Sequence, residues 1–160
     1  GDIVLHEESL NRGSVIRNCS TSNIGTENSS TRFRCVDLIF ENNRFEDFHF
    51  WFHAGKNGPR PRDIVLKNNR VSDKRRGGIV FQQGLNCDLQ DNQLNGVSLE
   101  FFKSENMHLA GNRWTGMKAE QPHVIARKGS TVRLTGDKQG SDPDSAKWIQ
   151  HDNTSKVIRK

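Results

Sequence analysis

The segment Leu38-Ile-Phe-Glu-Asn-Asn43-Arg-Phe45 sets out a pattern that the chain repeats. Apolar residues stand five and three positions before an Asn, and another stands two positions after it. Three further copies have the same form: Ile64-Val-Leu-Lys-Asn-Asn69-Arg-Val71, Cys87-Asp-Leu-Gln-Asp-Asn92-Gln-Leu94 and Met107-His-Leu-Ala-Gly-Asn112-Arg-Trp114. The intervals between these asparagines are 26, 23 and 20 residues, and a fifth copy ends on Asp137 instead of Asn. Periods of this length are typical of solenoid architectures.

Within each copy the apolar residues alternate, which predicts a strand with Leu38 and Phe40 on one face. The Asn interrupts the alternation, because its short amide tolerates left-handed backbone angles and hydrogen-bonds to nearby backbone. A third apolar stretch follows each copy, such as Phe50-Trp-Phe52. Three short strands per repeat predict an all-β, single-stranded, right-handed parallel β-helix of about five to six coils. We expect the asparagines to form a ladder of paired amides.

The composition agrees with such a fold, since only 32% of the residues are hydrophobic while glycine numbers 14 and tyrosine is absent. A leucine-rich repeat is the alternative, but it requires a denser leucine consensus. We divide the chain into an imperfect first coil at 1–32, the regular coils at 33–137, and a tail or capping segment at 138–160. The first coil contains Val15-Ile-Arg-Asn18, and Cys87 is predicted to be a small core residue.

The repeated phrase, followed by a Gly-hydrophobic strand such as Gly78-Ile-Val-Phe81, resembles the pectate lyase-like, right-handed parallel β-helix superfamily over about residues 33 to 137. That superfamily includes polysaccharide lyases and epimerases, many glycoside hydrolases and phage tailspikes. The resemblance implies a carbohydrate-active protein that acts on or binds a polysaccharide. It also implies a secreted protein, whether extracellular, periplasmic or on a virion surface, either as a homotrimer like many tailspikes or as a domain of a longer parent chain.

An aromatic platform for sugars is predicted where the third strand of each coil turns side chains outward. Alternation turns Trp51 and His53 outward when Phe50 and Phe52 point inward. Gln82 and Glu100 take matching outward positions on the following strands. Aromatic faces beside polar groups fit sugar rings. The alternative is that Trp51 packs under the loop at 56–62.

The charge is +5 with a pI of about 9.4, and its densest part is the window 56–76, which holds eight cations and two aspartates. We predict one local basic surface there, on which Arg60, Arg62 and Arg76 bind an anionic polysaccharide through their guanidinium forks. The alternative is a solvated edge that prevents association between strands. Nucleic acid is not favoured, because no aromatic-rich single-strand motif or recognition helix is present.

Two short phrases, Lys103-Ser-Glu-Asn106 and Arg127-Lys-Gly129, are similar to those of the β-helical alginate lyase and chondroitinase B family. The resemblance implies that Lys103 is the general base and Arg127 the general acid of a β-elimination beside a uronate carboxylate. It also implies calcium, for which we place no ligands; no other cofactor or metal is predicted.

Two alternatives to the lyase remain open. One is glycoside hydrolysis with Glu100 as a catalytic carboxylate. The other is a non-catalytic glycan-binding or structural module. The sequence shows no 18-residue apolar run and no signal-peptide core, as expected of a mature secreted chain that does not enter a membrane.

Overall fold

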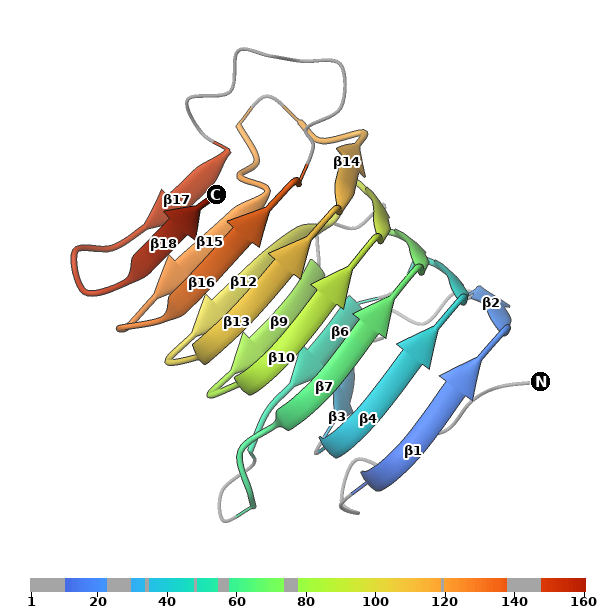
Figure 1. The fold of residues 1–160 in the computed structure, drawn as a ribbon. Coiled ribbons are helices and arrows are strands. Elements are labelled where there is room, and N and C mark those ends of the chain that lie inside the picture. The colour runs from blue at the N-terminus through green and yellow to red at the C-terminus, as the bar shows by residue number, and fades with distance from the viewer. Residues whose placement is uncertain are drawn as a thin grey trace.

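The computed structural model describes residues 11–22, 30–33, 35–47, 49–54, 58–73, 78–118, 120–137 and 148–160, and these residues form strands and turns (Figure 1). Three parallel sheets surround one core. Sheet A contains, in spatial order, β1 (Asn11–Arg17), β4 (Cys35–Glu41), β7 (Arg62–Lys67), β10 (Leu85–Gln90), β13 (Glu105–Ala110), β16 (Thr131–Thr135) and β18 (Lys156–Arg159). Sheet B contains β14 (Arg113–Thr115), β11 (Gln93–Asn95), β8 (Arg70–Ser72), β5 (Arg44–Glu46) and β2 (Ser20–Ser22). Sheet C contains β17 (Ile149–His151), β15 (Val124–Arg127), β12 (Ser98–Phe102), β9 (Gly78–Gln82), β6 (His49–Phe52) and β3 (Ser30–Phe33).

The predicted parallel β-helix is confirmed, since each regular coil gives one strand to each sheet in the order A, B, C. Within the described residues sheets A, B and C have seven, five and six strands, which is close to the predicted five to six coils. In Figure 1 the strands of sheet A cross the front, the chain returns behind them through sheet C, and successive coils advance from β1 to β18. This winding is right-handed, as parallel crossovers almost always are.

The core is a narrow column of inward side chains that stack from coil to coil. Phe52, Phe81 and Phe101 stand on neighbouring strands of sheet C, with ring centroids 4.6 and 5.7 Å apart. Cys87 is 1% exposed, and burial raises the pKa of its thiol to about 12, so it is the core residue that the sequence predicted. Because each coil buries the next, a chain with few apolar residues still encloses its inward side chains completely.

The asparagine ladder lies at the turn between sheets A and B, and its amides pair between coils as predicted. The Nδ2 of Asn43 donates to Oδ1 of Asn69 at 3.0 Å, and Asn69 donates in the same way to Asn92 at 3.1 Å. The series continues through Asn112 and ends on Asp137, whose Oδ1 accepts from Asn112 at 2.8 Å. An aspartate suits the end of the ladder because it only needs to accept. Burial raises the pKa of Asp137, while the hydrogen bonds from Asn112 act in the opposite direction.

Two details of this turn differ from the prediction. The ladder asparagines do not carry the left-handed angle; the preceding residues do, as at Asn42 (φ 58°) and Asn68 (φ 52°). The ladder side chain can therefore point into the core while its neighbour reverses the chain. In the first coil the ladder position is taken by Cys19 and not by Asn18, because the Cys19 amide donates to Oδ1 of Asn43 at 2.9 Å.

A serine ladder, which the repeat pattern did not reveal, occupies the turn between sheets C and A. The amide of Gly84 donates to Oγ of Ser104, that of Ser104 to Oγ of Ser130, and that of Ser130 to Oγ of Ser155, at 3.0, 3.0 and 3.1 Å. The hydroxyls of Ser104 and Ser130 in turn donate to carbonyls of the strands before them. Both corners flanking sheet A thus satisfy their buried backbone through stacked polar side chains.

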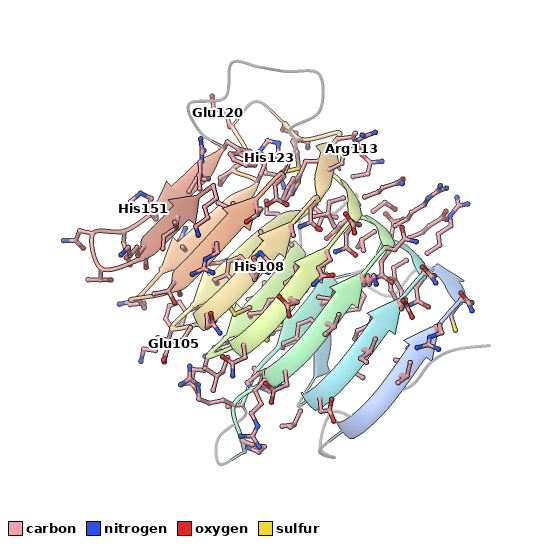
Figure 2. All side chains as sticks on the ribbon, viewed as in Figure 1. Glu105, His108, Arg113, Glu120, His123 and His151 are labelled. Carbon is pink, nitrogen blue, oxygen red and sulfur yellow. The ribbon has the colours of Figure 1, made fainter. Side chains whose placement is uncertain are left out.

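Residues 148–160 continue the helix, because β17 pairs with β15 and β18 pairs with β16. Residues 138–147 of the predicted tail or capping segment lie outside the described residues. At this end three rings pack together in the interior: His123, which Figure 2 labels, lies 5.9 Å from Trp114 and 6.2 Å from Trp148, and the two tryptophan rings are 6.0 Å apart. The guanidinium of Arg159 covers Trp148 at 4.5 Å. Burial lowers the pKa of His123 to about 4, so its ring is neutral at neutral pH.

Candidate functional site

The outer face of sheet C carries two rows of half-exposed side chains, which we call the outer strip. Burial alternates along β6, so that Phe50 and Phe52 are buried while Trp51 faces outward. Parallel register fixes the neighbours of each residue on the adjacent coils. The first row is Trp51, Val80, Glu100 and Ile125; the second is Gln82, Phe102 and Arg127.

The outer strip mixes apolar and polar groups on neighbouring coils. Strands lie about 4.8 Å apart, so each row is a ladder of side chains at that spacing along the helix axis. Trp51 and Phe102 offer aromatic surface, and the His53 ring lies 5.5 Å from the Trp51 ring. Gln82 and Glu100 offer hydrogen-bonding groups within the same rows. Residues 56–57 of the loop 56–62, under which Trp51 packs in the alternative interpretation, lie outside the described residues.

Lys103 and Arg127 are brought together at the end of the outer strip, where sheet C turns into sheet A. Phe102 pairs with Arg127, and the amide of Lys103 donates to the carbonyl of Arg127 at 3.1 Å. Both side chains are exposed, and none of the ion pairs found within the described residues involves either of them. Glu100 stands on the same face in the middle of β12, two residues before Phe102, and its register neighbour on β15 is Ile125.

The phrase from Lys103 to Asn106 also has a structural part at this corner. Lys103 takes a left-handed angle (φ 50°), as Gln83 does at the equivalent turn (φ 63°). Ser104 belongs to the serine ladder, and Asn106 donates to Oδ1 of Asn86 on the neighbouring coil at 2.9 Å. Glu105, the first residue of β13 and labelled in Figure 2, forms an ion pair with Arg60. The residue types of this phrase therefore follow in part from the turn itself.

The described cations of the predicted basic window, Arg60, Arg62, Lys67 and Arg70, do not all lie on one surface. Arg60 lies at the corner of sheets C and A, where its Nε donates to the carbonyl of Gln83 at 2.9 Å. Arg62 and Lys67 stand on sheet A, whereas Arg70 stands on sheet B. The reason is geometric: a window of 21 residues is about one coil long, so its cations are distributed around the helix. Arg76 lies outside the described residues.

Two titratable residues near the outer strip were not predicted as site residues. His49 begins β6, and burial lowers its pKa, while the charges of Asp73 and Glu100 act in the opposite direction. Asp73 follows β8 and is 7% exposed. The sequence showed Asp73 only as a counter-charge in the basic window; the turn between sheets B and C brings it toward His49. The charges of Asp73 and Glu100 thus both raise the pKa of His49 at the edge of the outer strip, against the effect of burial.

The sequence resemblance implied calcium without placing its ligands. In the described part of the chain, no three His, Cys, Asp or Glu side chains lie close enough together to hold a metal ion. We therefore derive no step through calcium. The same residues contain no helix that is long and apolar enough to cross a membrane.

Comparisons with known proteins agree with the fold. No family model matches the chain, and no curated protein sequence matches it. Its structure is similar to the crystal structure of a putative glycosyl hydrolase from Parabacteroides merdae, with a TM-score of 0.64 and 6% identity over 94% of this chain and 78% of that one. At this identity the likeness shows shared architecture. The class that fold and comparison define is the parallel β-helix protein.

Proposed function

We propose that the protein binds an anionic polysaccharide along the outer strip of sheet C. The observation that carries this proposal is the register of Trp51, Gln82, Glu100, Phe102 and Arg127 on four neighbouring strands. The aromatic rings pack against the apolar faces of sugar rings, and the polar side chains hydrogen-bond to hydroxyls. The description of the similar structure as a putative glycosyl hydrolase supports carbohydrate as the ligand class.

The charge at the end of the strip favours an acidic polymer. Lys103 and Arg127 are exposed at adjacent positions, and the guanidinium fork of Arg127 matches the two oxygens of a carboxylate or sulfate. A polymer lying along the helix axis would present its sugars to the two aromatic residues and an acidic group to this pair of cations. A neutral polysaccharide would lack the second interaction.

A second candidate function, β-elimination, is favoured by the adjacency of Lys103 and Arg127. Neutral Lys103 would take the proton next to the uronate carboxylate, while Arg127 would stabilise the negative charge that develops on that carboxylate. The electron pair of the broken C–H bond would form the carbon–carbon double bond, and the glycosidic C–O bond would break. The departing oxygen would take a proton from Lys103 or water.

Replacing Trp51 by alanine should weaken binding of polygalacturonate about tenfold, because an aromatic contact of this kind contributes roughly 1.4 kcal/mol. Retardation in a gel containing the polymer measures the affinity. Ile158→Ala removes an apolar side chain from the outer face of sheet A and serves as the control, with no change expected. Equal affinity of the Trp51 variant and the parent would place binding elsewhere.

Lys103→Ala and Arg127→Ala should each lower the rate of β-elimination about a hundredfold or more, as expected when a proton-transfer or charge-stabilising group is lost. Ultraviolet absorbance of the unsaturated product measures this rate. Gln83→Ala is the matched control for Lys103→Ala, because both substitutions place alanine at a left-handed turn position.

The parent protein itself separates the candidate activities. Unsaturated product supports elimination, and new reducing ends without absorbance point to hydrolysis, with Glu100 as the candidate carboxylate. Retardation without depolymerisation identifies a binding module.

A further inference from the structure

The outer face of sheet B carries a second arrangement of side chains in register, apart from the outer strip. Each of β5, β8, β11 and β14 has three residues, of which the middle one is buried and the other two face outward. The register aligns the outward residues into two rows. One row is Arg44, Arg70, Gln93 and Arg113; the other is Glu46, Ser72, Asn95 and Thr115.

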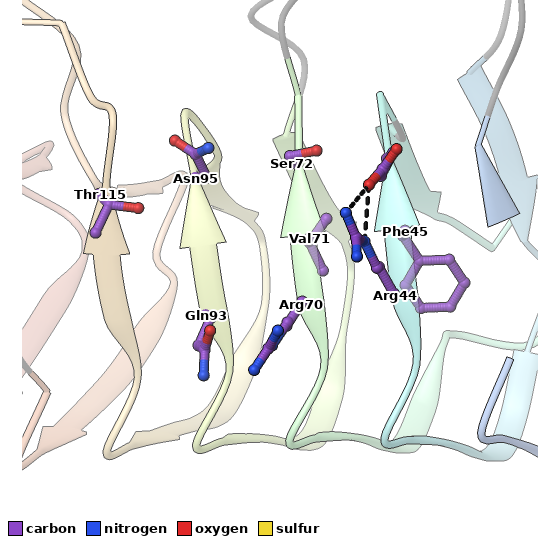
Figure 3. A pocket seen from close by; sticks show the side chains of 9 residues that line it. Arg44, Phe45, Arg70, Val71, Ser72, Gln93, Asn95 and Thr115 are labelled. Carbon is purple, nitrogen blue, oxygen red and sulfur yellow. Dashed lines mark hydrogen bonds and ion pairs between the residues drawn. The ribbon is translucent and has the colours of Figure 1, made fainter. Parts of the chain in front are cut away.

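A shallow trough of about 350 Å³ lies over this face (Figure 3). Its polar lining comes from both rows, with Arg70 and Gln93 on one side and Ser72, Asn95 and Thr115 on the other. Because the rows run from coil to coil, the trough extends along the helix axis. It therefore presents a row with Arg44, Arg70 and Gln93 opposite a row in which the carboxylate of Glu46 is followed by hydroxyl and amide groups. Arg113 continues the first row beyond the lining of the trough.

The cations of this face differ in whether they are neutralised. Arg44 pairs with Glu46 of its own strand, with Nε 2.7 Å from Oε1. Arg70 and Arg113 are exposed, and within the described residues neither takes part in an ion pair. They stand on β8 and β14 with Gln93 between them, which places their backbones roughly 9.6 Å apart, two strand spacings.

We infer that the outer face of sheet B is a second binding site for an anionic polysaccharide. Arg70 and Arg113 bind its carboxylate or sulfate groups through their guanidinium forks, while Gln93 and the row opposite hydrogen-bond to sugar hydroxyls. Single-stranded nucleic acid fits this face less well, because the aromatic side chains of these strands, Phe45 and Trp114, are buried and offer no stacking surface.

This site is separate from the outer strip, since none of its residues belongs to sheet C. It does not depend on the proposed function: a polymer can bind here whether or not the outer strip binds one. If both faces bind, the protein takes up two short oligosaccharides at saturation, and variants on one face leave the other intact. Titration with heparin and galacturonate oligosaccharides, followed calorimetrically, resolves the two sites.

The test is the double substitution Arg70→Ser with Arg113→Ser. The expected result is about a tenfold loss of heparin affinity at the sheet B site, because two exposed charge pairs contribute together roughly 1.4 kcal/mol. The matched control removes two cations from the outer face of sheet A, Arg133→Ser with Lys156→Ser, and should change the affinity less than twofold. Arg70→Lys with Arg113→Lys keeps the charge but loses the fork, and should give an intermediate loss. Unfolding temperatures verify that all variants remain folded.

Three outcomes would overturn the inference. An equal loss in the sheet A control would show that only net charge matters. Full retention of affinity in the double variant would show that the polymer binds elsewhere. Tighter binding of single-stranded DNA than of either oligosaccharide, lost in the double variant, would assign the face to nucleic acid.

Discussion

Replacing Asn69 by alanine should lower the free energy of unfolding by roughly 4 kcal/mol, a large part of the stability of a domain of this size. The Asn69 side chain is fully buried. Its Nδ2 donates to the carbonyl of Phe40 at 3.0 Å and to Oδ1 of Asn92 at 3.1 Å. Its Oδ1 accepts from the amide and from Nδ2 of Asn43, both at 3.0 Å.

The expected loss is large because alanine leaves the partners of Asn69 buried without hydrogen bonds. Each unsatisfied buried polar group costs about 1–3 kcal/mol, and water does not reach the middle of the ladder. The substitution also weakens the contacts between the coils on either side of Asn69, and each coil is stabilised mainly by its neighbours. We therefore expect the urea midpoint to fall and the unfolding transition to become less cooperative.

Urea denaturation followed by circular dichroism measures this loss. Gln93→Ala is the matched control, because it truncates an exposed amide one residue after the ladder position Asn92, and should change stability by no more than about 0.5 kcal/mol. Equal midpoints for the Asn69 variant and the control would contradict a structural role for the ladder.

Acid should lower the free energy of unfolding by up to roughly 3 kcal/mol below pH 4, because unfolding lets His123 take up a proton. Burial lowers the pKa of His123 from about 6.5 to about 4 in the folded chain. A histidine whose pKa is lower in the folded state binds its proton more readily when unfolded. The stability that its neutral form contributes is therefore complete above about pH 6.5, and it is lost as the pH falls toward 4.

The substitution His123→Phe isolates this effect, because phenylalanine keeps the edge contacts with Trp114 and Trp148 and does not titrate. Urea midpoints at neutral pH and near pH 4 should fall much less in this variant than in the parent. The exposed His151, replaced by Gln, is the control and should follow the parent. A His123→Phe variant that loses as much stability in acid as the parent would show that other groups cause the acid sensitivity.

The repeat alone was sufficient to predict the strands, the parallel stacking and the amide ladder. These features depend on spacing, and spacing is visible in the chain: Leu38 and Phe40 had to share a face, and Asn43 had to recur at the same turn. The serine ladder was missed because Gly84, Ser104, Ser130 and Ser155 occur in segments without a common phrase. The ladder position of the first coil was assigned to Asn18 and not to Cys19, because Cys19 stands where the other coils have an asparagine.

The candidate sites could be predicted less completely from the sequence, because their arrangement depends on the register between coils. Alternation placed Trp51, Gln82 and Glu100 on an outer face, but the row that joins Trp51 to Glu100 required the register between coils. Of the cations in the predicted basic window, the four that the structure describes, Arg60, Arg62, Lys67 and Arg70, do not all share one surface, because cations close in sequence turn away from each other around a coil. The sheet B site shows the converse, since Arg70 and Arg113 are 43 positions apart in the chain and only two strands apart in space.

The sequence by itself thus determined the β-helix, because a solenoid is built from local patterns that contact only their neighbours in the stack. The tertiary structure alone decided which outward side chains lie on the same sheet and which arginines have no ion-pair partner among the described residues. It also brings the charges of Asp73 and Glu100 close enough to His49 to act on its pKa. The physical reason is that a coil wraps once around the axis every 20 to 26 residues. Small differences in turn length therefore decide which residues of successive coils come together.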